Sequence, residues 1–595
     1  MSRYARTTFP QRNPIRFGKL TESFIISAIS KATARPLVIS EAGIQEQPLS
    51  RRAHRHEDKN SAIRGAISRV LIAVCIGAPA AAQNAPPQIT TPDEVETSVG
   101  TLTLIDGVPT TDTAQLLYDR LDLSRGIDTV LNAFSGVSMY AIRKGFRDVG
   151  VKDGDVLIFS KLLGSESLFL TANADTVYFW SYLNLRNGPI VVSVPPGVLG
   201  AIDDMWFRWI TDFGVSGPDR GEGGKYLLLP PGYEGPLPEG GYVVKRSRTF
   251  GVGLIGRAFL EDNDPEPAVT NVKDNLKIYA YSRGGYGFSV GEFLAGKSPL
   301  GTLAPAAAPR FVEGSGKVMN TIPPNDYSYY QMLNSLVQEE PAEALDPEIA
   351  GQFAAIGIRK DARFAPDARM KKILEDAVVI GNVTSRAIGT RGRPEEGFAY
   401  YGRASHWSLP LQVGGFDFMN KPPLVTRDGV KPFPSAGART LDARTAFFYL
   451  ATVVSPAMSM NVTEIGSQYL GTFLDGSGDP MDGAKTYKLK LPRGIPAAKF
   501  WSVTLYDNQT RSMLQTSQIY PRVGSQSYPT PAAEPDRDGS TTIYMSPEKP
   551  ESAKDGNWIQ TTPGKGWFAL LRFYSPTTAF FDKTWRPGEI QEVSQ

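Results

Sequence analysis

The chain has 595 residues, of which 41% are hydrophobic, and its 63 Lys and Arg residues almost balance its 61 Asp and Glu residues. This length allows two or three domains with buried cores. The basic excess lies within residues 1–82, and no later stripe of Lys and Arg with interleaved aromatic residues is present, so we expect no nucleic-acid partner.

Residues 63–82 have the pattern of a secretory signal peptide. Arg69 precedes a short apolar run, and Ala80 and Ala82 form a small-residue cleavage site before Gln83. The run is shorter than the roughly 20 apolar residues that span a bilayer, and no other segment approaches that length. We therefore expect no membrane span and a periplasmic or secreted product that begins at Gln83.

Residues 1–62 precede this signal, although a signal peptide normally opens a chain. We interpret them as the product of an over-extended gene prediction; the alternative is a basic, disordered cytoplasmic leader. The single Cys75 lies within the signal, and the preceding Val74 is too bulky for a lipoprotein cleavage site. The mature chain is thus expected to have no disulfide and no thiol chemistry.

The rest of the chain is predicted to form two β-rich domains with a helical connector. Residues 83–110 are interpreted as a Pro-rich tether, 111–265 as an N-terminal β-rich domain with a leading helix, 266–455 as the connector and 456–595 as the C-terminal domain. Apolar periodicity predicts helices at 112–133, 326–337, 367–380 and 442–454. Short apolar or alternating runs predict strands at 177–183, 190–194, 205–213, 226–229, 242–244, 487–491, 500–506, 541–545 and 567–574. The expected fold class is mixed and mainly β, with two β-sandwich, jelly-roll-like domains.

The two β-rich regions share an ordered series of residues. In each, a strand ends at a Pro, a Trp follows with an Asp six residues later, and a closing apolar strand carries an Arg. The matched residues are Pro195, Trp206, Asp212 and Arg257 in the first region and Pro492, Trp501, Asp507 and Arg572 in the second. We interpret the series as a duplication of one β module; the alternative is that sandwich strands generally end at Pro and Gly.

These motifs resemble a bacterial envelope family that consists of two domains of unknown function, DUF1254 followed by DUF1214. The matching segments are Asn173–Tyr178, the strand that ends at Pro195 and Gly224–Gly232 for the first domain, and Tyr487–Leu491, Phe500–Asp507, Asp538–Ser540, Pro563–Gly564 and Arg572–Pro576 for the second. The resemblance covers the chain from about residue 110 to its end. It implies paired β-sandwich domains joined by helices, and it implies no particular reaction.

Polar residues stand at the start of the first long strand of the DUF1254-like region. Asp175 is a candidate acid or base with Tyr178 beside it, and Asn173 is a candidate ligand-binding residue. The alternative is an Asx-type turn in which Asp175 accepts bonds from backbone N–H groups.

The predicted strand 205–213 contains several aromatic side chains and a guanidinium group. Because successive strand residues point to opposite faces, Trp206 and Arg208 would share a face and could hold a sugar ring or a carboxylate. Burial of the Trp on the inner face of a sandwich is the commoner use.

Arg257 and Arg572, in the two closing strands, are candidate carboxylate-binding residues. The alternative, which we favour slightly, is that they form structural ion pairs with Asp212 and Asp507.

His406 is the only His outside residues 1–82, and it is a candidate ligand-binding residue and general base. The alternative is a hydrogen-bonded structural role. The acidic loop 475–483 lacks the closing Glu and the central Gly of an EF-hand, and a tight turn explains it more simply. No Gly-rich loop precedes a helix in the manner of a phosphate site. We therefore expect no metal and no cofactor.

These observations predict an exported protein that binds a small polar or carbohydrate-like ligand in a cleft between the domains. Asp175 and Tyr178 would make it a carboxylate-based hydrolase; the alternatives are ligand binding without turnover and an architectural envelope protein. Two carboxylates about 5 to 10 Å apart across a cleft would favour hydrolysis. A cleft with one buried, Arg-paired Asp would favour binding. The oligomeric state is not indicated.

Overall fold

The computed structural model describes residues 86–281, 308–393, 398–409, 411–419, 424–426, 429–431 and 438–593. They belong to one compact unit, residues 85–595. The predicted leader and signal peptide lie outside the described residues. In the described ranges, no helix combines the length and the apolar character that crossing a bilayer requires.

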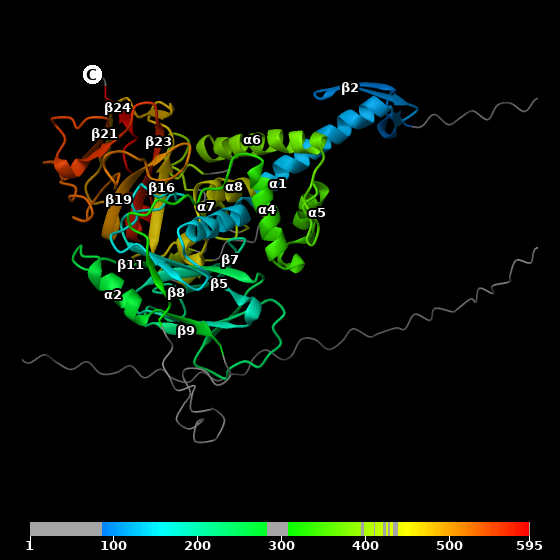
Figure 1. The fold of residues 1–595 in the computed structure, drawn as a ribbon. Coiled ribbons are helices and arrows are strands. Elements are labelled where there is room, and N and C mark those ends of the chain that lie inside the picture. Colours follow the sequence, from blue (N-terminus) through cyan, green and yellow to red (C-terminus); the bar gives the residue numbers. More distant parts are fainter. Residues whose placement is uncertain are drawn as a thin grey trace, which may run out of the picture. The chain divides into compact units, whose positions relative to one another are not determined.

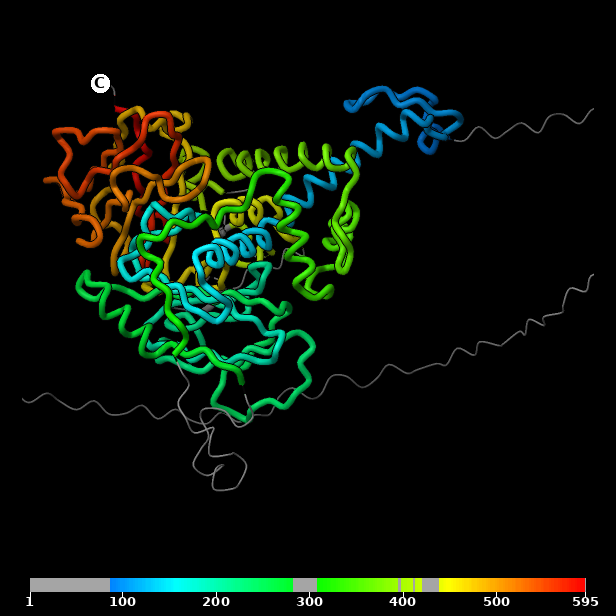
Figure 2. The backbone as a smooth tube through the Cα atoms, in the orientation of Figure 1, coloured from blue at the N-terminus to red at the C-terminus, as the bar shows by residue number. Residues whose placement is uncertain are grey.

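A small sheet and a long helix open the described chain. The strands β1 (Glu94–Thr97), β2 (Gly100–Ile105) and β3 (Val108–Pro109) pair in that order, and α1 (Thr111–Asp148) follows. The predicted tether 83–110 therefore contains a sheet. The Thr113 hydroxyl of α1 holds it by accepting a hydrogen bond from the Thr103 backbone N–H at 2.9 Å. Figures 1 and 2 show α1 running from this sheet in among the other helices.

The helix α1 continues past its predicted end at residue 133. Glycine lowers helix propensity, so Gly136 and Gly145 weaken the sequence pattern there. A Cβ at Gly136 would lie 2.4 Å from the ring of Trp206, and one at Gly145 would lie 2.5 Å from the backbone oxygen of Asn320. Close packing of α1 against its neighbours therefore requires these glycines.

The first domain contains two sheets. One has the order β13-β4-β5-β11-β7-β8 and the other the order β10-β9-β6-β12. The bounds are β4 (Val156–Ile158), β5 (Val177–Asn184), β6 (Ile190–Val194), β7 (Leu199–Asp204), β8 (Trp209–Gly214), β9 (Gly224–Leu229), β10 (Val243–Arg246), β11 (Gly251–Ala258), β12 (Lys277–Ala280) and β13 (Phe311–Glu313). Because β12 pairs with β6, this domain continues beyond the predicted boundary at residue 265.

The second domain also contains two sheets, with the orders β16-β23-β19-β20 and β22-β21-β18-β24. The bounds are β16 (Ser467–Thr472), β17 (Met481–Asp482), β18 (Tyr487–Leu491), β19 (Ala497–Asp507), β20 (Arg522–Gly524), β21 (Thr541–Ser546), β22 (Trp558–Gln560), β23 (Gly566–Pro576) and β24 (Gln591–Glu592). The short β17 pairs with β23.

Eight strands of each domain have the same topology. In chain order, β5 to β12 correspond to β16 and β18 to β24, and the two strand orders β5-β11-β7-β8 and β16-β23-β19-β20 are equivalent. The pairing directions also agree. Within this common set, the parallel pair is β9–β10 in the first domain and β21–β22 in the second, and the other pairs are antiparallel. This agreement supports the duplication inferred from sequence.

In each domain the two sheets bury apolar side chains against each other. In the first, Phe179 of β5, Leu254 of β11 and Leu228 of β9 belong to one apolar cluster. In the second, the Trp567 ring of β23 packs against that of Tyr487 of β18, with their centroids 5.4 Å apart. The fold is therefore mixed and sheet-rich, and the jelly-roll detail stays a prediction.

Helices connect and cover the two domains. Their bounds are α2 (Glu266–Asn275), α4 (Ser328–Glu339), α5 (Pro347–Ala355), α6 (Ala368–Thr390), α7 (Leu411–Gly414), α8 (Leu441–Leu450), α9 (Pro456–Ser459) and α10 (Thr578–Phe581), and a hairpin of β14 (Leu424–Thr426) and β15 (Gly429–Lys431) follows α7. The hydroxyls of Tyr329 and Tyr330 in α4 donate to the carbonyls of Val130 and Gly126 in α1. These buried bonds join the connector to the leading helix.

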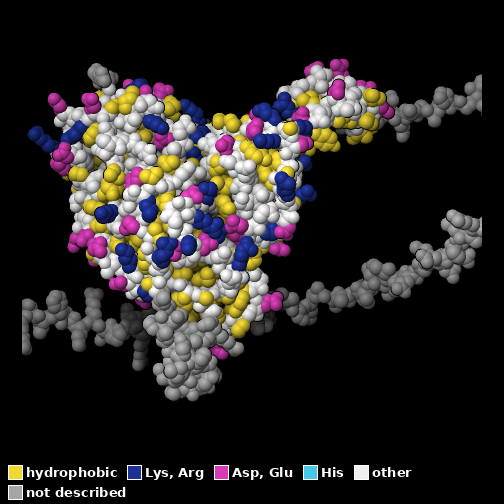
Figure 3. Space-filling model, viewed as in Figure 1, with side chains coloured by type: hydrophobic (Ala, Val, Ile, Leu, Met, Phe, Trp, Pro, Cys, Tyr) yellow, Lys and Arg dark blue, Asp and Glu magenta, His cyan; other side chains and the backbone are white. Residues whose placement is uncertain are grey.

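Acidic and basic side chains are interspersed on the face shown in Figure 3, without a large area of one sign.

Candidate functional site

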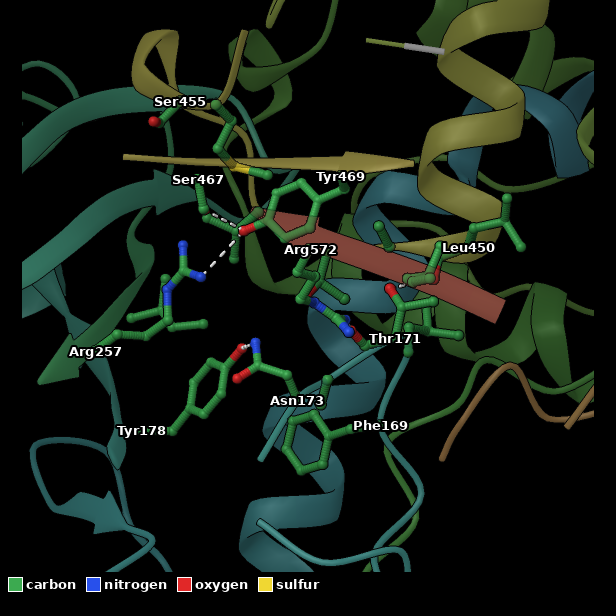
Figure 4. Close-up of a pocket in the computed structure, with 18 of the residues that line it drawn as sticks. Phe169, Thr171, Asn173, Tyr178, Arg257, Leu450, Ser455, Ser467, Tyr469 and Arg572 are labelled. Atoms are coloured by element: carbon green, nitrogen blue, oxygen red, sulfur yellow. Dashed lines mark hydrogen bonds between the residues drawn. The ribbon is translucent and has the colours of Figure 1, made fainter. Parts of the chain in front are cut away.

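A cavity of about 190 Å³ lies between the two domains. Alternate residues of four strands line it: Tyr178 and Trp180 of β5, Ile255 and Arg257 of β11, Ser467, Tyr469 and Gly471 of β16, and Phe568, Leu570 and Arg572 of β23. Residues two apart in a strand share a face, so one face of each domain's first sheet borders the cavity. The opposite faces of these sheets carry the apolar clusters described above. Figure 4 shows the polar lining residues converging from both domains.

Two guanidinium groups reach the cavity. No Asp, Glu, His, Lys or Cys stands among its described lining residues. Arg257 is partly exposed, and its Nη1 donates to the Tyr469 hydroxyl at 3.1 Å. Arg572 is only 1% exposed, and its Nη2 donates to the carbonyl of Thr171 at 2.7 Å. The described lining is thus basic and otherwise largely apolar.

The pairing register places these groups symmetrically. Arg257 in β11 lies opposite Tyr178 in β5, and Arg572 in β23 lies opposite Tyr469 in β16. Since these strands are equivalent in the two domains, each domain contributes one Arg–Tyr couple. The hydrogen bond from Arg257 to Tyr469 then joins the Arg of one domain to the Tyr of the other.

The Tyr469 phenol is surrounded by cations and a hydroxyl. Its oxygen lies 2.6 Å from Ser467 Oγ and accepts the bond from Arg257 (Figure 4). Burial alone would raise the pKa of Tyr469. The charge and hydrogen bond of Arg257, the bond with Ser467 and the charge of Arg572 outweigh burial and hold the pKa below its ordinary value.

The predicted residues Tyr178 and Asn173 both line the cavity. Asn173 Nδ2 donates to the Tyr178 hydroxyl at 2.7 Å, and Asn173 Oδ1 accepts from the Asp175 backbone N–H at 3.0 Å. Burial raises the pKa of Tyr178, although the nearby Arg257 opposes the rise. Tyr178 is therefore a neutral phenol at ordinary pH.

Asp175 does not line the cavity but joins the domains. Its carboxylate is fully buried, 2.9 Å from Nε of the equally buried Arg522. It also accepts hydrogen bonds from the Ser502 and Tyr574 hydroxyls, at 2.8 and 3.1 Å. Arg522, Ser502 and Tyr574 belong to strands of the second domain, while Asp175 precedes β5 of the first. We call these four residues the clasp. Arg522, Ser502 and Tyr574 thus engage the carboxylate of Asp175, which the sequence predicted to act as an acid or base.

Trp206 and Arg208 lie elsewhere, among the helices. The predicted strand 205–213 is interrupted because the Asp204 carboxylate accepts bonds from the backbone N–H groups of Trp206 and Arg208, and Phe207 has a φ of 51°. The expected common strand face of Trp206 and Arg208 is therefore wrong. Trp206 stacks on Phe353 at 6.0 Å between ring centroids.

Arg208 forms an ion pair with Asp204 at 2.6 Å and also donates to the carbonyl of Ala344. Neither Trp206 nor Arg208 is among the described residues that line the cavity.

His406 lies outside the described lining of the cavity, although Ser408 belongs to it. The backbone N–H of His406 donates to Glu589 at 3.2 Å, which fixes its loop against the second domain. The structure thus does not bring His406 together with Arg257 and Arg572.

The ion pairs expected for Arg257 and Arg572 do not form. Among the described residues, Asp212 accepts from the Trp209 indole at 3.0 Å, and Asp507 accepts from the backbone N–H of Gln509 and contacts Lys565 at 3.3 Å. Both Arg side chains are left without a carboxylate partner in the described part of the chain, because these carboxylates are engaged elsewhere.

Sequence reasoning missed Tyr469, Ser467, Thr171 and Val453. The duplication contained a signal for Tyr469. If Arg572 is the equivalent of Arg257, then the strand that pairs with Arg572 should carry an equivalent of Tyr178, and this residue is Tyr469. Thr171 and Val453 are β-branched cavity residues with φ values of 43° and 64°, a left-handed conformation that such residues rarely adopt. Nothing in their sequence predicts it.

No gathering of three or more His, Cys, Asp or Glu side chains that could hold a metal ion occurs among the described residues. The acidic loop expected to be a tight turn has Asp475 accepting from the backbone N–H groups of Ser477 and Asp479.

The fold and the cavity define a protein of two topologically equivalent, sheet-rich domains that share one basic, apolar-walled cavity. Family models described as proteins of unknown function match both domains: DUF1254 at residues 155–280 and DUF1214 at residues 466–578. The chain therefore contains a DUF1254 domain followed by a DUF1214 domain, as the sequence motifs predicted.

Two solved structures match this chain. The VPA0106 protein from Vibrio parahaemolyticus is 19% identical, with a TM-score of 0.44, covering 80% of this chain and 100% of that one. An uncharacterised protein from Burkholderia cenocepacia is 12% identical, with a TM-score of 0.33, covering 80% of this chain and 96% of that one. No curated protein matches this chain.

Proposed function

We propose that the cavity binds an organic anion with an apolar body, such as a medium-length carboxylate. The observation that carries this proposal is the guanidinium of Arg257, which meets the cavity without a carboxylate partner among the described residues. An unpaired charge in an apolar environment is costly, and a ligand carboxylate would relieve that cost. The forked donors of a guanidinium also match the two oxygens of a carboxylate.

The cavity wall supports an apolar ligand body. Aromatic and aliphatic side chains make up most of it, including Phe169, Trp180, Phe568 and Leu570. A carbohydrate would need hydrogen-bond partners for several hydroxyls. Apart from the two Arg–Tyr couples, the polar side chains of the described lining are Asn173 and a minority of Ser and Thr residues, of which Asn173 is engaged by Tyr178 and Thr171 by the Leu450 carbonyl. The wall therefore favours an alkyl or aromatic carboxylate over the carbohydrate-like ligand considered from sequence.

The clasp supports binding without hydrolysis. A carboxylate-based hydrolase needs two carboxyl groups about 5 to 10 Å apart on either side of the scissile bond. Asp175 is buried outside the cavity and paired with Arg522, and the described lining of the cavity has no carboxylate. A cavity whose described lining offers two guanidinium groups and no carboxylate favours a binding protein over a carboxylate-based hydrolase.

Backbone strain beside the cavity adds a second line of support. The left-handed conformations of Thr171 and Val453 cost of order 1–3 kcal/mol each. Such strain persists where the surroundings hold it, and it is common at ligand sites. Thr171 also accepts the hydrogen bond from Arg572 and donates to the Leu450 carbonyl at 2.8 Å.

The proposal is tested by calorimetric titration with a series of straight-chain carboxylates centred on octanoate. We expect octanoate to bind and octanol, its neutral counterpart, to bind far more weakly. Arg257→Gln should lower octanoate affinity by at least about tenfold, the value of one charge-assisted hydrogen bond. Arg246→Gln, an exposed Arg of β10, is the matched control and should leave the affinity unchanged.

Equal binding of octanol and octanoate, or no binding of any carboxylate, would contradict the proposal. An architectural role predicts the second outcome.

Export is part of the same proposal, and it rests on residues 63–82 of the sequence. N-terminal sequencing of the protein from an expressing cell's envelope should begin at Gln83. A cytoplasmic product that retains residues 1–82 would contradict it.

A further inference from the structure

The cavity holds more positive charge than its surroundings balance. The Asp175 carboxylate is matched by Arg522, so this pair is neutral as a unit. Arg257 and Arg572 then leave two positive charges in one largely apolar cavity, and both act on Tyr469. Burying two unbalanced cations is unfavourable, which favours the ionised form of any acid placed between them.

Tyr469 is placed between these cations. Its oxygen accepts from Arg257 Nη1 at 3.1 Å, and the Arg572 guanidinium carbon lies 5.6 Å from the centroid of its ring. Ser467 Oγ, 2.6 Å away, can donate to the same oxygen. A phenolate at this position would therefore accept hydrogen bonds from both groups.

The other phenols near the site have different surroundings. The Tyr574 hydroxyl of β23 donates a hydrogen bond to the Asp175 carboxylate, and burial together with that charge raises the pKa of Tyr574. Tyr178 of β5 meets an amide, and burial raises its pKa as well. The titratable and charged groups that act on Tyr469 are Arg257 of β11, Arg572 and Tyr574 of β23 and Tyr178 of β5. Asp175 and Tyr506 of β19 lie one step further away, beside Tyr178 and Arg572. Among these described phenols, Tyr469 is the one that combines a hydrogen bond from a guanidinium, a neighbouring hydroxyl and a second guanidinium over its ring.

We propose that Tyr469 supplies the counter-charge of the ligand-free cavity and that a bound organic anion replaces it, one proton being taken up by the Tyr469 oxygen for each anion bound. This inference rests on the proposed function and adds its regulation. The step forms one O–H bond with a proton from solvent, breaks no covalent bond and needs no oxidant or reductant. The site takes up the equivalent of an undissociated acid, held as an anion on Arg257 and a proton on Tyr469.

The sign of the pH dependence follows from this exchange. An anion beside Tyr469 disfavours the phenolate, so the complex binds a proton more tightly than the free protein does. Affinity is then highest below the pKa of Tyr469 in the free protein. It falls by about tenfold per pH unit above that point, until the pKa of the complex is reached. The two guanidinium groups stay charged throughout, because the pKa values of Arg257 and Arg572 are raised further.

The test combines calorimetry with ultraviolet absorbance on the full protein, with octanoate as the probe. In two buffers of different ionisation enthalpy, we expect an uptake of about one proton per octanoate above the pKa of Tyr469. The tyrosinate absorbance of the free protein should fall when octanoate is added. Tyr469→Phe should abolish the proton uptake, the absorbance change and the pH dependence together. Tyr118→Phe, which removes an exposed phenol outside the described lining of the cavity, is the control and should keep all three.

Two further measurements keep the inference falsifiable. In the absence of octanoate, the tyrosinate titration should lose its lowest-pH phase in Tyr469→Phe, and Ser467→Ala should move that phase to higher pH. Octanoate binding that is independent of pH and leaves the tyrosinate absorbance unchanged would overturn this inference and leave the proposed function standing. Failure of every carboxylate to bind would overturn both. A Tyr469→Phe protein that binds more weakly at all pH values, with the slope retained, would show a merely structural hydrogen bond.

Discussion

The two domains place an Arg and a Tyr at equivalent strand positions, yet the two Arg side chains have different surroundings. Arg257 of the DUF1254 domain is partly exposed to the cavity, whereas Arg572 of the DUF1214 domain is 1% exposed and donates to the Thr171 carbonyl. The Tyr residues opposite these two Arg residues also have different hydrogen-bond partners. Tyr178 meets the Asn173 amide, and Tyr469 meets Arg257.

The difference shows how a repeated module acquires two roles at one position. The same strand pair supplies a reachable cation from one domain and a buried cation from the other. In this account Arg257 contacts the ligand and Arg572 contributes its charge and holds the segment at Thr171. The clasp is likewise one-sided, since Asp175 of the first domain engages three residues of the second.

The largest expected effect comes from breaking the clasp. Arg522→Met leaves the Asp175 carboxylate buried without its cation, which should lower the free energy of unfolding by about 3–5 kcal/mol. Urea denaturation followed by circular dichroism measures it. Lys372→Met, which removes the exposed ion pair with Asp376, is the control and should cost about 0.5 kcal/mol or less. A loss below about 1 kcal/mol for Arg522→Met would show that the clasp does not hold the domains together.

A smaller effect on the free energy of unfolding is expected at Asp212, the first-domain member of the matched carboxylates Asp212 and Asp507. Burial raises the pKa of Asp212 to about 6 from 3.8, although bonds from Trp209 and Ser455 oppose the rise. The protonated form is thus favoured in the folded state, and its stabilising contribution is full below about pH 4 and lost as the pH rises through 6.

Asn cannot ionise, so Asp212→Asn should gain stability relative to the native protein between these pH values, by on the order of 2 kcal/mol. The measurement is the difference in unfolding free energy between the two proteins at each pH. A difference that stays constant with pH would contradict the burial of an ionising carboxyl at this position.

The smallest effect distinguishes the two Arg residues directly. Arg257→Gln should weaken octanoate binding by at least about tenfold, whereas Arg572→Gln should weaken it by only a few fold, because its guanidinium is shielded from the ligand. Calorimetric titration of both variants at one pH provides the comparison. Equal losses would mean that both domains contact the anion alike.

Much of the strand framework could be predicted from local pattern. Pro and Gly end the strands at predictable places, and Tyr487–Leu491 alternates as a half-buried strand should. The equivalence of Arg257 and Arg572 was readable for the same reason, since each stands in a closing apolar strand. These features depend on residues that are close in the sequence.

The features that could not be predicted from the sequence depend on contacts between distant residues or on one local turn. The Asp204 carboxylate turns the backbone at Trp206, which a period-two pattern cannot reveal. The partners of Asp175 lie more than 300 residues away, so its motif marked an important residue without showing its role. Tyr469 acquires its partner Arg257 only when the two domains dock.

A crystal structure of the protein with octanoate tests the central claim most directly. We expect the carboxylate within hydrogen-bond distance of the Arg257 guanidinium and the alkyl chain along Phe169 and Leu570. Octanoate found outside the cavity, or inside it with its carboxylate turned away from Arg257, would contradict the account.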